Sequence, residues 1–151
     1  MNADKEAQLY AKYPEIFRQK DLPMTQTCMC WGFDCGGGWY KLIDDLCAQI
    51  MFVCNLAAVE PPSASQVKEK YGMLRFYTDG VAGPELLDDV ITSIISCAER
   101  RSCYTCEECG EMGKLHDDGW CVVKCDDCYK EYCERTGRTY NEEDYDNTET
   151  T

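Results

Sequence analysis

The clearest pattern of apolar and polar positions lies in residues 38–57, where apolar side chains recur every three or four positions. This is the spacing of an amphipathic helix that buries one face. Residues 85–101 repeat the pattern with a stripe of leucine, valine, isoleucine and alanine. We therefore predict two long helices, the first of which ends at the Glu60-Pro61-Pro62-Ser63 segment.

A third region, residues 66–79, has the aromatic residues and the alternation of a β-strand. It forms either two strands or one strand interrupted near Gly72. Residues 3–20 predict an N-terminal helix, which Pro14 must kink or restart because proline lacks a backbone N–H. Together these elements predict an α+β fold in which helices pack on a small β-sheet.

Two cysteine pairs near the C-terminal end define a candidate metal site. Cys106 and Cys109 form one C-x2-C pair, and Cys125 and Cys128 form another after fifteen intervening residues. This is the ligand spacing of a zinc ribbon, in which four thiolates surround one Zn²⁺. A closed shell of four thiolates has no open coordination position, so we expect a structural zinc.

The residues around the four cysteines fit a ribbon. Gly110 follows the first pair and allows the positive φ that a tight turn needs. Asp118-Gly119 is a hairpin signal, residues 120–123 are typical of a strand, and a helix is expected from about 126 to 135.

Further cysteines and the single histidine leave alternatives open. Cys103 could replace Cys106 as a ligand, because 103, 106 and 109 are equally spaced; the glycine favours Cys106. Cys121 and Cys133 are expected to be small apolar packing residues. His116 serves as a turn residue or an alternative ligand, and no Ser-His-Asp or Cys-His set follows from the spacing.

Composition and charge limit the class of protein. The chain has 151 residues, 13 cysteines and a net charge of −13. An odd cysteine count with metal-ligand spacing favours the reducing cytosol over a disulfide framework. There is no apolar run of membrane-spanning length and no apolar signal core in MNADKEAQLY, so we expect a cytoplasmic protein without a membrane partner.

Three domains are expected: an α+β core at 1–102, the zinc ribbon at 103–138 and a disordered acidic tail at 139–151. Many zinc ribbons bind nucleic acid, but residues 103–133 of this chain carry eight acidic and three basic side chains. Direct nucleic-acid binding is therefore disfavoured, since phosphate backbones would be repelled.

One candidate binding segment precedes the first long helix. It comprises Cys28, Cys30, Trp31, Asp34, Cys35, three glycines and Trp39. The three consecutive glycines lie before a helix N-terminus and could bind an anion there. The simpler alternative is that both tryptophans of the segment pack in the core. Its cysteines could form a second metal site, although the one-residue spacing of Cys28 and Cys30 suits a single zinc poorly.

A second candidate is the basic set Lys68, Lys70 and Arg75. On an extended strand Lys68 and Lys70 share a face, where they could meet a phosphate or carboxylate over Trp31 or Trp39. The alternative is a solvated strand face or internal ion pairs.

Three blocks of sequence carry a resemblance to a known family. They are WGFDCGGGWYKLIDDLC at 31–47, VKEKYGMLRFY at 67–77 and CEECGEMGKLHDDGWCVVKCDDC at 106–128. In these blocks the chain resembles small zinc-ribbon proteins of tailed bacteriophages and prophages, a family that is largely uncharacterised. The resemblance implies a phage gene, and phage genes of this size often encode accessory proteins that disable host systems.

Several functions therefore stay open. The first is a non-enzymatic phage protein that binds and inhibits a host defence factor through an acidic surface. Its partner would be a host protein, for example one that binds nucleic acid. The second is a binder or sponge for a nucleotide signal, and the third is a nucleic-acid-binding ribbon. An enzyme is the least supported, because no catalytic set can be assembled from the sequence.

Overall fold

The structure, a computed structural model, describes residues 1–117 and 119–140. Its helices and strands follow one another as α1 Ala3–Lys12, β1 Phe33–Asp34, α2 Tyr40–Ala57, β2 Ala64–Glu69, β3 Leu74–Thr78, α3 Glu85–Ser102, β4 Lys114–His116, β5 Val122–Lys124 and α4 Asp126–Thr136. Two short 3-10 helices, Met29–Trp31 and Gly37–Trp39, precede β1 and α2. The predicted α+β class is confirmed.

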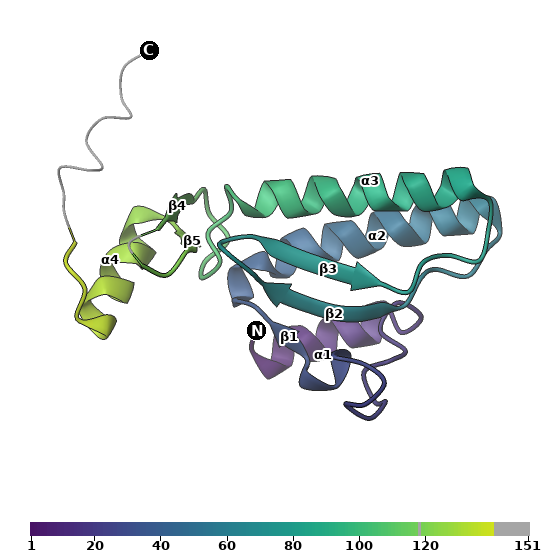
Figure 1. The fold of residues 1–151 in the computed structure, drawn as a ribbon, viewed down its shortest axis with the longest axis horizontal. Coiled ribbons are helices and arrows are strands. Elements are labelled where there is room, and N and C mark those ends of the chain that lie inside the picture. The colour runs from purple at the N-terminus through teal and green to yellow at the C-terminus, as the bar shows by residue number, and fades with distance from the viewer. Residues whose placement is uncertain (118, 141–151) are drawn as a thin grey trace, which may run out of the picture.

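The larger sheet has the strand order β1-β2-β3, with β1 parallel to β2 and β3 antiparallel to it. The long helices α2 and α3 pack side by side along this sheet (Figure 1). Residues 66–79 thus form two strands, and the turn at Gly72 separates them. The two predicted long helices are present, and both contribute apolar side chains to one hydrophobic core.

Side chains from neighbouring helices cover both outer edges of this sheet. The N–H groups of Leu74 and Phe76 on β3 donate to Ser102 Oγ at 2.8 Å and to Glu99 Oε1 at 3.1 Å. On the other edge, Phe33 N–H donates to Glu6 Oε1 at 2.9 Å. Because unpaired strand edges invite association with other chains, these contacts help to hold the sheet as a closed unit.

The N-terminal helix is shorter than predicted. The helix α1 ends at Lys12, and residues 14–20 form turns where the sequence predicted helix up to residue 20. Proline at position 14 lacks the N–H that would continue the helix. Ile16 and Phe17 are nevertheless fully buried. The apolar spacing of these residues therefore reflects their burial in the core, which they reach without forming a helix.

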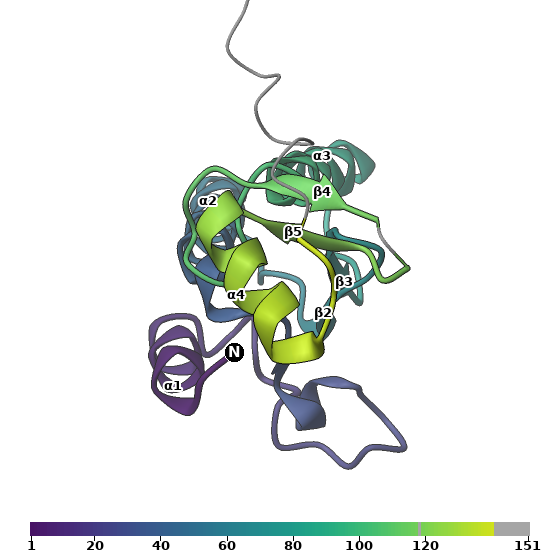
Figure 2. The same cartoon turned by 90° about the vertical axis from the view of Figure 1, so that its left-hand side faces the viewer.

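The C-terminal part forms a ribbon at one end of the molecule, and α3 leads directly into it (Figure 1). Strands β4 and β5 pair as an antiparallel hairpin, and α4 lies next to β5, as the end-on view in Figure 2 shows. The ribbon has a small hydrophobic cluster of its own, formed by Val122, Tyr129 and Cys133. Tyr140 packs against this cluster. Residues 141–151, most of the predicted acidic tail, lie outside the described residues.

Among the described helices, none combines the length and apolarity needed to cross a membrane.

Candidate metal centre

Four thiols converge at the base of the ribbon. The Sγ atoms of Cys106, Cys109, Cys125 and Cys128 all lie within 4.8 Å of one another. The Cys109 and Cys125 sulfurs are 3.6 Å apart. In a tetrahedron with Zn–S bonds of about 2.3 Å, neighbouring sulfurs are about 3.8 Å apart. The quartet therefore has the size and donor type of a Zn²⁺ site, and all four of its cysteines are free thiols.

Local backbone structure explains how each pair converges. Gly110 has a φ of 88°, the left-handed conformation predicted after the first pair. Its N–H donates to the Cys106 carbonyl at 2.9 Å and closes a tight knuckle. In the second pair, Cys125 is the N-cap of α4, so Cys128 lies in the first helical turn. The helix N-terminus there favours negative charge on both thiolates.

The thiols differ in how readily they lose a proton. Burial by itself would raise the pKa of Cys106, but backbone N–H groups of Glu108 and two neighbouring cysteines donate toward its sulfur and lower the pKa to about 7. Burial and adjacent thiols raise the pKa of Cys109 and Cys128. A bound metal ion would supply the positive charge that keeps these sulfurs deprotonated.

The alternative ligands lie elsewhere. Cys103 caps the end of α3, and its thiol faces the Glu99 carbonyl at 3.8 Å. His116 is buried on β4 and stacks on the Tyr129 ring with centroids 3.5 Å apart. Cys133 is buried in the ribbon cluster as predicted, whereas Cys121 is half-buried beside a surface groove. Among the described residues, the gathered set therefore contains Cys106.

The glycine run holds the metal knuckle against the α+β core. Gly38 N–H donates to the Glu107 carbonyl at 2.7 Å, and Gly36 N–H donates to Glu107 Oε1 at 2.7 Å. The buried Trp39 ring donates from Nε1 to the Thr105 carbonyl at 2.8 Å. At this helix start, a carboxyl group of the chain itself, that of Glu107, accepts the Gly36 N–H. Burial raises the pKa of Glu107, while the bond from Gly36 acts in the opposite direction.

This docking leaves no room for side chains at two of the three glycines. A Cβ on Gly36 would meet the Glu107 carbonyl oxygen at 2.2 Å, and one on Gly38 would meet the Cys106 carbonyl oxygen at 2.3 Å. Both clashes involve backbone atoms, which cannot move aside as a side chain can. The run is therefore a close backbone contact between core and ribbon, a role that spacing alone did not suggest.

No second metal cluster forms from the remaining cysteines of the segment. Cys35 is buried, and desolvation raises the pKa of its thiol to about 12. Cys28 is exposed, and the Cys30 thiol donates to the Thr27 carbonyl at 3.3 Å. Within residues 1–117 and 119–140, the C-terminal quartet alone gathers as metal-binding groups.

The six predicted ligand-binding residues do not form one pocket. Trp39 is buried, but Trp31 is 71% exposed, so the expectation of two core tryptophans is wrong for Trp31. Asp34 lies on β1 opposite Lys68 in the register and is exposed to solvent. Arg75 forms an ion pair with Glu99 at 3.4 Å.

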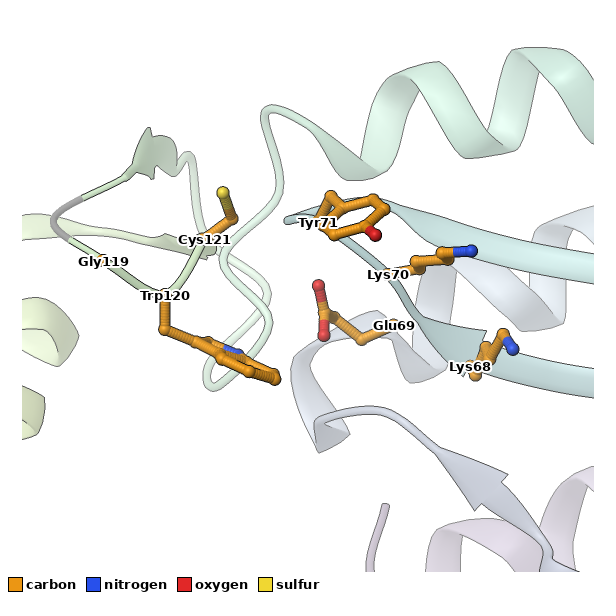
Figure 3. Close-up of a pocket in the computed structure, with 7 residues that line it drawn as sticks. All are labelled: Lys68, Glu69, Lys70, Tyr71, Gly119, Trp120 and Cys121. Atoms are coloured by element: carbon orange, nitrogen blue, oxygen red, sulfur yellow. The ribbon is translucent and has the colours of Figure 1, made fainter.

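Lys68 and Lys70 do line a groove, between the β2–β3 turn and the ribbon (Figure 3). The aromatic rings in it belong to Tyr71 and Trp120, which the sequence argument missed. A signal was available for Tyr71, because a bulky residue directly before glycine in a two-residue hairpin turn is unusual. No signal in the sequence pointed to Trp120, because its position beside β2 depends on how the ribbon docks on the core.

Comparisons with protein-family models, with curated proteins and with solved structures give no match for this chain. What the protein does must therefore be argued from the site. The four-cysteine cluster could hold a metal ion such as zinc, in a closed shell that suits a structural role.

Proposed function

We propose that this chain is a non-enzymatic, zinc-stapled accessory protein of a tailed bacteriophage or prophage. It acts in the cytoplasm of the infected cell, where it binds and inhibits a host defence factor through an acidic surface. The observation that carries the proposal is a row of unpaired carboxylates on α4, the helix that the second cysteine pair anchors.

The acidic surface is defined by Asp127, Glu131 and Glu134. Their spacing of four and three residues places them on one face of α4, and all three are exposed. In the part of the chain that the structure describes, none of them forms an ion pair, whereas nearby Asp126 and Glu108 are paired with lysines. This face therefore presents three exposed carboxylates that form no ion pair with a described residue.

The metal gives this surface a fixed position. Cys125 and Cys128 lie at the start of α4, and Cys106 belongs to the knuckle that is hydrogen-bonded to the core. A zinc ion bound by all of them would tie α4 to both parts of the molecule. A rigid, charged surface loses less conformational freedom on binding, which favours affinity for a partner.

The partner that fits this surface is a basic protein, such as a host protein that itself binds nucleic acid. Complementary charge accelerates association and makes it sensitive to salt. The net charge of −13 disfavours the nucleic-acid alternative. We expect no gel shift with DNA or RNA even at low salt.

The test compares two triple variants that each remove three negative charges. Asp127→Asn, Glu131→Gln and Glu134→Gln neutralise the α4 face. Glu15→Gln, Glu60→Gln and Asp89→Asn do the same at exposed positions elsewhere. The partner is first captured from host lysate with the zinc-loaded protein, identified and purified, and its affinity is then measured by calorimetry at two salt concentrations.

We expect the α4 variant to lose about tenfold or more in affinity and to show a weaker salt dependence, while the control stays within about twofold. Equal losses in both variants would show that only net charge matters. The proposal would be refuted if no basic partner is captured, or if the affinity for the partner does not change with salt concentration.

A further inference from the structure

The groove between the β2–β3 turn and the ribbon has the features of a ligand-binding site. It has a volume of about 500 Å³ and is lined by Lys68, Glu69, Lys70, Tyr71, Gly119, Trp120 and Cys121. Figure 3 shows Trp120 reaching from the ribbon toward the turn, with the Glu69 carboxylate directed between it and Tyr71. Trp120 is 65% exposed and Tyr71 is 74% exposed. Each ring therefore offers an aromatic face to a ligand.

Tyr71 is held in a conformation that a tyrosine disfavours. It has a φ of 55° and precedes Gly72, whose φ is 73°. Lys70 and Met73 flank the two residues and exchange backbone hydrogen bonds of 2.8 and 3.2 Å. Such a turn favours asparagine, aspartate or glycine at its first position, because a bulky side chain is strained there.

Burial does not compensate for this strain, since most of the Tyr71 ring is exposed. Local strain that brings no packing in return is typical of residues that serve binding. Gly72 meanwhile docks the turn on the ribbon: a Cβ there would lie 2.5 Å from Leu115 Cδ1. The groove therefore lies at a fixed junction, with the strained tyrosine at its rim.

The groove also carries two positively charged side chains, Lys68 and Lys70. Across the described residues, neither Lys68 nor Lys70 has a carboxylate within ion-pair distance, although the chain has 28 acidic and 15 basic side chains. Their ammonium groups lie 5.7 Å from the Tyr77 ring centre and 5.3 Å from that of Tyr71, respectively. Figure 3 shows both lysine side chains extending along the sheet, away from Trp120.

We propose that this groove binds a free nucleotide. The base stacks on Trp120 and Tyr71, and the phosphates lie toward Lys68 and Lys70. Glu69 Oε1 accepts the Gly72 N–H at 2.6 Å, which fixes the carboxylate so that its other oxygen can accept from an amino group of the base.

The overall charge favours a nucleotide over a nucleic-acid strand. Each further phosphate of a polymer would lie over a protein with a net charge of −13, whereas a nucleotide places its few charges beside the two lysines. The groove is separate from the α4 surface, so nucleotide binding can be tested independently of the proposed host-protein binding.

The experiment measures binding of AMP, GMP, ATP, GTP and cyclic dinucleotides to the zinc-loaded protein by calorimetry. Inorganic phosphate and ten-nucleotide DNA and RNA strands are tested alongside. We expect at least one nucleotide to bind, and neither phosphate nor the strands to bind as tightly. Trp120→Ala should weaken binding about tenfold or more, because a stacked base is lost. Lys68→Gln with Lys70→Gln should weaken it and reduce its salt dependence.

Tyr71→Asn separates binding from folding. Asparagine suits the turn, so the melting temperature should stay the same or rise, while nucleotide affinity should fall about tenfold. Trp31→Ala is the matched control, because Trp31 is 71% exposed and does not line the groove. It should leave binding unchanged.

Four results would overturn the proposal. They are no binding by any nucleotide, tighter binding by DNA or RNA strands, equal binding by inorganic phosphate, and nucleotide binding that survives the Tyr71 and Trp120 substitutions. Because Tyr71→Asn and Trp120→Ala alter different modules, a folding defect in one leaves the other as a valid test.

Discussion

Gly38→Ala should separate the metal ribbon from the α+β core. A Cβ at this position would lie 2.3 Å from the Cys106 carbonyl oxygen and 2.5 Å from the Gly110 nitrogen. Both atoms belong to the backbone of the knuckle, which its cysteines hold in place when metal is bound. The neighbouring Trp39 is fully buried and prevents the glycine from retreating. The two parts must therefore move apart.

The cost can be worked from the contacts that would be lost. They are the hydrogen bond from Gly38 N–H to the Glu107 carbonyl, that from Gly36 N–H to the Glu107 carboxylate, and that from Trp39 Nε1 to the Thr105 carbonyl. At about 1 kcal/mol net for each bond, the free energy of unfolding should fall by about 3 kcal/mol. For a chain of this size, that corresponds to a melting temperature lower by about 10 °C.

Gly37→Ala is the matched control from the same glycine run. A Cβ there would meet only the flexible Lys5 side chain, with Nζ at 3.3 Å. Its stability should change by less than about 1 kcal/mol, in either direction. Zinc-loaded Gly38→Ala, Gly37→Ala and wild type are compared by urea denaturation and by zinc release to a chromogenic chelator. Equal stability and equal release rates for the two variants would refute the docking role of the run.

Three further predictions concern single side chains. Glu107→Ala leaves a backbone N–H of the glycine run without its acceptor and should cost about 1–2 kcal/mol in urea denaturation. Glu107→Gln keeps the acceptor and should cost less than about 0.5 kcal/mol, so equal costs would contradict this account. Cys106→Ser should lower zinc affinity at least about tenfold in a chelator competition, whereas Cys103→Ser should retain about one zinc per chain. If instead Cys103→Ser loses zinc and Cys106→Ser keeps it, Cys103 is the ligand. Burial opposes ionisation of Asp44, but hydrogen bonds from Lys12 and a tyrosine hydroxyl prevail and lower its pKa. The resulting stabilisation is present above the unfolded-state pKa of about 3.9 and is lost as pH falls through the lower folded-state value. Asp44→Asn should therefore lose about 1 kcal/mol at pH 7 and show less of the wild-type decline toward pH 3 in urea titrations, and parallel pH curves would count against it.

Periodicity and spacing determined the parts of this protein that depend on short-range geometry. The stripes in 38–57 and 85–101 predicted α2 and α3, because a helix that buries one face must repeat its apolar residues at its own period. The two C-x2-C pairs predicted the quartet for a similar reason. Each pair converges within one turn, so only the meeting of the two turns depended on the fold.

Tertiary structure alone decided what the less regular residues do. Trp31 and Trp39 lie eight positions apart in one segment, yet the first is exposed and the second is buried against the knuckle. The Gly36 contact with Glu107 joins residues 71 positions apart. Likewise, Tyr71 and Trp120 share a groove only because the ribbon docks beside the β2–β3 turn. Such contacts between distant segments have no period or spacing in the chain, because they arise from how separately formed elements pack.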